Sequence, residues 1–144
     1  MPDFNISVRE QNGVVIIDTD GYLNNVGGEI IASECYSQVD KGKKDFILNL
    51  EKSPVVNSIG VSIIIEIIEK LQDVNGSLSY FNLAPIVDKT FSIMGLTKYS
   101  TIYTNEEEAL KNLEDQRMEW CCKLIDKLDD ILSNLFFNLF LIIS

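Results

Sequence analysis

The hydrophobic positions of this chain change repeatedly between the period of a strand and the period of a helix. Alternating or short apolar stretches predict five strands, at residues 4–9, 14–23, 45–50, 77–83 and 100–104. The turn signal "QNG" at residues 11–13 predicts a hairpin between the first two strands. Helical spacing predicts helices at residues 28–40, 58–74 and 85–94, and a further one after Asn105.

This order of elements predicts an α/β fold. Strands that alternate with helices form a mixed, mostly parallel sheet, with right-handed crossovers and helices covering it. Asn105 with Glu108 three residues later is a capping-box pattern at the start of the last helix. We expect one α/β domain over residues 1–114 and a C-terminal helical, apolar extension over residues 115–144.

Composition removes several classes of function. The formal net charge of -10 argues against a nucleic-acid partner, because binding to phosphates needs an excess of Lys and Arg. The chain has no histidine, which removes the commonest general base and most zinc sites. We therefore expect no catalytic residues, no cofactor and no metal. The start of the chain does not resemble a signal peptide, and its three cysteines fit a reduced, cytoplasmic protein.

The stretch "VVNSIGVSIII" at residues 55–65 is the first candidate site. It places Asn57 and Ser58 after the central strand, at the carboxyl edge of the sheet, where α/β proteins gather their ligand and partner sites. The plainer interpretation is that Asn57 or Ser58 only caps the helix that follows. The apolar side of that helix spans roughly 200°, wider than a core-facing stripe needs. Either the sheet and neighbouring helices cover all of it, or an edge near Ile63 and Ile67 stays exposed for a partner.

Beyond these patterns, the chain resembles STAS domains of the anti-sigma factor antagonist type. The resemblance rests on the order of "FILNL", "VNSIG", "NGSLSYFNL" followed by Pro85, "IMGL" and "EEEAL", and it covers roughly residues 3–113. It implies a protein that binds an anti-sigma factor with kinase activity and so frees a sigma factor. No catalysis by this chain is implied.

The resemblance also implies a phosphorylation switch, and here the chain departs from the family. Typical members read Asp-Ser-Ser/Thr-Gly at the start of this helix, and the second hydroxyl is phosphorylated. Aligned on Gly60, this chain has Ile59 at that position, and isoleucine cannot accept phosphate. Either Ser58, or less readily Ser62, is phosphorylated instead, or the switch is lost. Taken together, the helix pattern and the resemblance predict as partner-binding residues Asn57, Ser58, Ile59, Gly60, Val61, Ile63 and Ile67.

The tail after Leu113 lies outside the resemblance. An apolar seam runs at heptad spacing through positions 121, 124, 128, 131, 135, 138 and 142, with Asn138 as its one polar member. Three interpretations stay open: a helix docked on its own domain, a homodimer formed through this helix, or contact with a membrane surface. The final apolar run, residues 131–143, is shorter than the ~20 residues of a membrane span.

A second function class therefore stands beside the regulatory one. It is a scaffold that is not phosphorylated and assembles through its C-terminal helix. An enzyme is a distant third, because Cys35, its best nucleophile candidate, has no base placed near it in the sequence.

Overall fold

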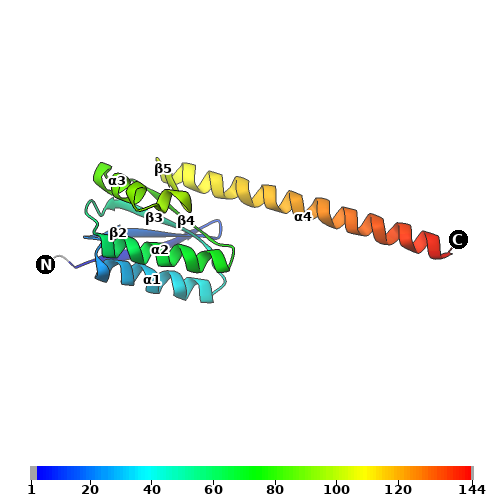
Figure 1. Cartoon of the computed structure of the whole chain (residues 1–144), viewed down its shortest axis with the longest axis horizontal. Helices are drawn as coiled ribbons and strands as arrows, with labels where there is room; N and C mark the ends of the chain where they lie inside the picture. The colour runs from blue at the N-terminus through cyan, green and yellow to red at the C-terminus, as the bar shows by residue number, and fades with distance from the viewer. Residues whose placement is uncertain (1–2, 144) are drawn as a thin grey trace. The chain divides into compact units, whose positions relative to one another are not determined.

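A computed structural model describes residues 3–143 and shows the expected mixed sheet (Figure 1). Its strand order is β1-β2-β3-β4-β5, with β1 antiparallel to β2 and the other neighbours parallel. The strands are β1 (Asn5–Gln11), β2 (Val14–Asp20), β3 (Asp45–Lys52), β4 (Ser77–Phe81) and β5 (Thr101–Tyr103). The helices are α1 (Asn25–Asp40), α2 (Ser58–Asp73), α3 (Pro85–Ile93), the short 3-10 helix η1 (Leu96–Lys98) and α4 (Glu106–Ile143). The predicted α/β class is confirmed.

The chain divides into two compact units, Met1–Leu110 and Lys111–Ser144. The predicted boundary between residues 114 and 115 falls inside α4, which continues through it without a break. The outermost residues of the two predicted segments, at positions 1, 2 and 144, lie outside the described residues.

The hairpin between β1 and β2 forms where the turn signal predicts it. Asn12 and Gly13 connect the strands with φ angles of 55° and 78°. Two successive positive φ values belong to the type I′ turn, whose twist matches that of the strands it joins, and Asn-Gly is the pair that adopts it most readily. The tight turn therefore pairs β1 with β2 in antiparallel orientation, and the later strands β3, β4 and β5 extend the sheet in parallel.

One face of the sheet carries the main hydrophobic core. Alternate strand residues such as Val15, Leu48 and Tyr80 point to this face, where α1, α2 and α3 pack against them. The ring of Tyr80 meets that of Phe91 from α3 edge to face, with centroids 5.1 Å apart. Helices on this face hold the carboxyl edge of the sheet, and with it the start of α2, in a fixed position.

A polar network on the opposite face joins β1, β2 and β3. Both oxygens of Asp18 accept hydrogen bonds from the Arg9 guanidinium, at 2.8 and 3.2 Å, and Asn49 donates to the same carboxylate at 2.8 Å. These hydrogen bonds, that from Arg9 above all, hold the pKa of Asp18 below its usual value. Arg9 also forms an ion pair with Glu106, in the first turn of α4. The network thus connects the start of the last helix with the sheet.

The first helix begins earlier than its pattern predicts. It starts at Asn25, three residues before position 28, because the Asn24 side chain caps it by accepting a hydrogen bond from the Gly27 N–H at 3.1 Å. Gly27 and Gly28 resemble helix breakers in the sequence, but both are buried inside the first turns of α1. Added Cβ atoms would lie 2.8 Å from the Phe4 side chain and 2.9 Å from the Ile63 side chain. The absence of a side chain at these glycines therefore allows Phe4 and Ile63 to pack closely against α1.

Candidate functional site

The candidate site is the amino-terminal end of α2, directly after β3. Asn57 is the N-cap: its side-chain oxygen accepts a hydrogen bond from the Gly60 N–H at 2.8 Å. Its own N–H donates to the Leu23 carbonyl at 3.1 Å. The plainer interpretation of Asn57, as a helix cap, is confirmed. Capping is not the only role open to this helix start, because the side chains of Ser58 and Ile59, next to Asn57, are exposed.

Gly60 allows two chain segments to meet here. A Cβ atom at this position would lie 2.3 Å from the Leu23 carbonyl oxygen and 3.1 Å from that of Asn24. Both neighbours are backbone atoms, so they cannot rotate away as a side chain could. Glycine at position 60 is therefore required for the start of α2 to lie against the loop that leads into α1.

The starts of α1 and α2 share one local pattern. The chain reads "YLNNVG" at residues 22–27 and "VVNSIG" at residues 55–60. In each, asparagine is the N-cap and its oxygen accepts from the glycine N–H three residues later. Leu23 and Val56 form a parallel bridge between the two segments. Two equivalent helix starts are thus held side by side.

The shared pattern leaves four apolar side chains exposed at this edge, which we call the edge patch. Its members precede the N-cap by two residues or follow it by two: Tyr22 (42% exposed), Val26 (52%), Val55 (53%) and Ile59 (56%). Of these four residues, only Ile59 is expected from the sequence. The repeated hexapeptide is the signal that would have found the other three, because equivalent positions around two N-caps face the same way.

Neither helix start carries charge in its first turn, since α1 and α2 both lack acidic residues there. Ser58 is exposed at the first position of α2. Ser62 is exposed one turn later, and its hydroxyl donates to the Ser58 carbonyl oxygen at 2.8 Å. Both serine side chains are therefore accessible at the surface, beside the edge patch.

The predicted exposed edge at Ile63 and Ile67 is wrong for Ile67. Ile67 and Val61 are both fully buried, so neither offers a surface to a partner. Ile63 is half-buried and packs where Gly28 of α1 leaves room for it. The physical reason is that α1 and the sheet cover the broad apolar side of α2, which is the plainer of the two interpretations of its width.

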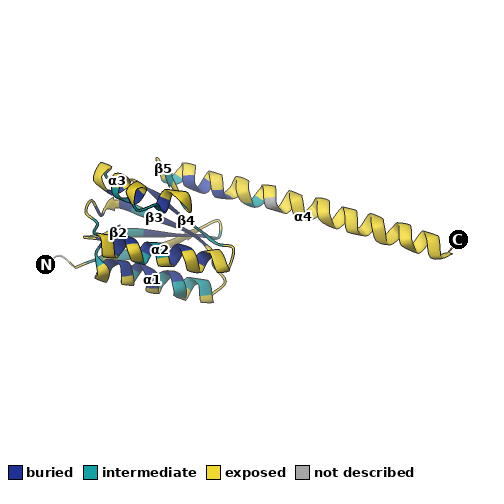
Figure 2. Ribbon diagram, viewed as in Figure 1, coloured by how far each residue is buried: buried dark blue, intermediate teal, exposed yellow. Residues whose placement is uncertain are grey.

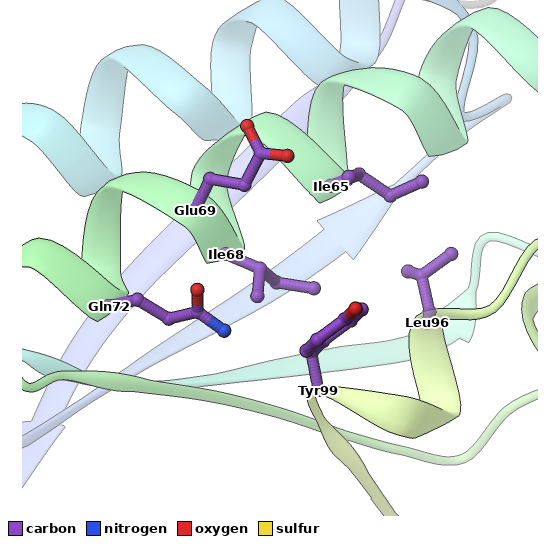
Figure 3. Close-up of a pocket in the computed structure, with 6 residues that line it drawn as sticks. All are labelled: Ile65, Ile68, Glu69, Gln72, Leu96 and Tyr99. Atoms are coloured by element: carbon purple, nitrogen blue, oxygen red, sulfur yellow. The ribbon is translucent and has the colours of Figure 1, made fainter.

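A shallow cavity of about 170 Å³ lies further along α2, facing η1 (Figure 3). Ile65, Ile68, Glu69 and Gln72 line it from α2, and Leu96 and Tyr99 from η1 and its end. Its walls are mostly apolar, with one carboxylate and one amide at the rim. Such a surface fits an apolar side chain and offers no cation to hold a phosphate group.

Two further findings concern the nucleophile candidate and possible metal ligands. Burial raises the pKa of the Cys35 thiol to about 12, so this candidate nucleophile is protonated at neutral pH. Within residues 3–143, no group of three or more acidic or cysteine side chains is placed to hold a metal ion.

In the same range, no helix is both long enough and apolar enough to cross a membrane.

Comparisons with known proteins agree on one family. The protein-family model described as "STAS domain" matches residues 5–109 of the sequence. The "Putative anti-sigma factor antagonist BtrV" of Bordetella bronchiseptica is 28% identical over 104 residues, which cover 72% of this chain and 90% of that protein. The "Anti-sigma F factor antagonist" of Paenibacillus polymyxa is 23% identical over 110 residues, covering 76% and 94%.

Solved structures show the same fold. The crystal structure of an anti-sigma factor antagonist from Mycobacterium paratuberculosis superposes with a TM-score of 0.69. The two sequences are 19% identical, and the match covers 78% of this chain and 95% of that one. At this identity the likeness concerns the fold alone.

Proposed function

The chain belongs to the STAS domain family, and from this premise we propose that it is a regulatory binding protein of the anti-sigma factor antagonist type. It captures an anti-sigma factor with kinase activity, and the sigma factor that this partner held is released. The cytoplasm is where such an exchange takes place. The observation that carries the proposal is Ile59, an exposed apolar side chain at the helix start where typical members carry the phosphorylated hydroxyl.

The edge patch supports docking of a protein at this place. Tyr22, Val26, Val55 and Ile59 expose apolar surface around two rigid helix starts. Buried apolar and aromatic anchors surrounded by polar groups supply most of the affinity in protein interfaces. Asn57 and Ser58 are the polar groups next to Ile59, and Gly60 keeps the backbone close. Val61 and Ile67 hold α2 in place from the core, and the half-buried Ile63 borders the patch.

The proposed complex differs from that of typical members in its switch. A phosphate at this position would bring a charge of about -1.5 to -2 into the interface and disrupt it by repulsion and desolvation. Ile59 has no hydroxyl and cannot be phosphorylated, so binding continues regardless of the kinase. Phosphorylation of Ser58 is the alternative, since its side chain is exposed one residue earlier. Ser62, whose hydroxyl already donates to the Ser58 carbonyl, is the weaker candidate.

Displacement of the sigma factor tests this function directly. We expect that the full chain, added to a preformed complex of the source cell's kinase-type anti-sigma factor and its sigma factor, releases free sigma factor. The release is measured by size-exclusion chromatography and rises with the amount of chain added. A sigma factor that stays bound when the chain is in large excess contradicts the proposal.

The Ile59→Ser substitution tests whether the switch can be restored. We expect the variant to gain one phosphate when it is incubated with the partner kinase and ATP, because the substitution places a hydroxyl at the usual position. The wild-type chain serves as the control and gains none, as read by intact-mass spectrometry. If the kinase leaves the variant unmodified, the surface by which typical members present this residue to the kinase has changed as well.

A scaffold that assembles through α4 is the second candidate function. The observation that favours it is the exposed apolar surface of that helix, which the edge patch does not explain.

A further inference from the structure

The second compact unit, Lys111–Ser144, exposes a large apolar surface along α4. Figure 2 shows this helix exposed over most of its length. Phe136, Phe140 and Ile142 are 75%, 64% and 82% exposed. Large contiguous apolar surfaces of this kind mark sites of contact with another molecule.

Between residues 121 and 135, the polar and apolar side chains of α4 are sorted by heptad position, whereas the last turns also carry exposed apolar side chains outside the seam, such as Phe136 and Phe140. With Cys121 at position a, the a and d positions hold Cys121, Leu124, Leu128, Ile131, Leu135 and Ile142, with Asn138 between the last two. The e positions hold Met118, Ile125, Leu132 and Leu139. All five charged residues between 121 and 135, namely Lys123, Asp126, Lys127, Asp129 and Asp130, fall at the remaining positions b, c, f and g. An apolar stripe three positions wide is typical of helices in a bundle.

The area of this stripe is what a stable self-association needs. Its nine large apolar side chains are exposed by between 39%, for Leu124, and 82%, for Ile142. At roughly 90 Å² each, they expose on the order of 800 Å² per chain. A specific protein interface of standard size buries about 800 Å² from each partner.

We propose that α4 is a self-association helix, which joins copies of this chain in a parallel bundle with their heptads in register. The inference does not depend on the proposed capture of an anti-sigma factor. Asn138 is the one polar residue of the a/d seam. A single asparagine in such a seam favours the register in which it meets its own copy, because any other alignment buries its amide against apolar side chains.

Insertion into a lipid surface explains the sorting less well. It would engage the apolar end, residues 131–143, but it requires no stripe along the two heptads before that end. Helices that lie on membranes carry Lys and Arg on their polar face, whereas here Asp126, Asp129 and Asp130 outnumber Lys123 and Lys127. The carboxylates would be repelled by anionic lipid. A second copy of the chain fits the whole stripe.

Two adjacent cysteines provide a matched test of this arrangement. Cys121 lies at position a and Cys122 at position b, and both are exposed. In a parallel, in-register bundle the Cys121 residues of two copies face each other, close to the Cα separation of about 4.4–6.8 Å that a disulfide requires. The Cys122 residues point away from the seam. Cys35 is buried, so we expect it to form no cross-link in either variant.

We expect the full-length Cys122→Ser variant, which keeps Cys121, to form a covalent dimer within minutes of adding diamide as the oxidant. The Cys121→Ser variant is expected to form at least tenfold less. Light scattering after size exclusion, under reducing conditions, is expected to give a multiple of the 16.3 kDa chain mass. A monomer at high concentration overturns the proposal, and so does equal cross-linking of the two variants. A monomer that floats with phospholipid vesicles would assign the stripe to a membrane surface instead.

Discussion

Replacing Gly60 with alanine is expected to lower the free energy of unfolding by about 2–4 kcal/mol, although alanine is the better helix former. The added Cβ would lie 2.3 Å from the Leu23 carbonyl oxygen, a backbone atom of the neighbouring segment. Relief of this overlap requires the start of α2 to move away from the loop before α1. Chemical denaturation of the variant beside the wild-type chain measures the loss.

Gly27→Ala is the matched control. Gly27 has the same place in α1 that Gly60 has in α2, three residues after the N-cap, with its N–H bonded to the capping asparagine. Its added Cβ would meet the side chain of Phe4 at 2.8 Å, and a half-buried side chain can shift where a backbone carbonyl cannot. We expect this variant to remain within about 1 kcal/mol of wild type. If both variants unfold alike, the close approach at Leu23 does not determine the position of α2.

Replacing Ile59 with glutamate is expected to weaken capture of the anti-sigma factor at least 100-fold, with the fold intact. Ile59 is 56% exposed, so the folded domain accepts the charge, but the proposed interface would bury it without a partner. Isothermal titration of the purified anti-sigma factor with wild-type and variant chains measures the change.

Ile93→Glu provides the comparison for this loss. Ile93 is 75% exposed at the end of α3, which runs from the carboxyl edge of β4 back toward the start of the parallel strand β5, and the substitution adds the same charge. We expect its affinity to stay within about threefold of wild type, because surface charges outside an interface mainly change association rates. Equal losses in both variants would mean that net charge governs binding and that the edge patch is not the docking surface.

The strands and the sheet could be predicted from the sequence because each strand carries a clear local signal. Asn12-Gly13 determined the hairpin, and the apolar run of β3 indicated a central parallel strand. The start of α1 was missed because Gly27 and Gly28 resemble a loop in the sequence. Their function is to admit Phe4 and Ile63, residues that are distant in the chain. Contacts of this kind leave no local pattern.

The candidate site was predicted in part for a similar reason. Asn57 and Ile59 stand out in one short stretch, whereas Tyr22 and Val26 belong to a different stretch, which the bridge between Leu23 and Val56 brings alongside. The width of α2's apolar side left two interpretations open, full cover or an exposed edge near Ile63 and Ile67, because the amount of cover is a property of the packing and cannot be read from one helix. The heptad pattern of the tail needs no tertiary contact, which is why the sequence already displayed it.

The proposed capture of an anti-sigma factor is tested by recovery of the natural partner on the full chain. The chain is used as bait in lysate of the source cell beside the Ile59→Glu variant, and its intact mass is measured before and after. We expect that the wild-type chain alone retains a kinase-type anti-sigma factor and that its mass does not change. A gain of one phosphate at Ser58 would contradict the loss of the switch. A wild-type chain that retains no such kinase, or a variant that retains it equally, would contradict the proposed function and its site.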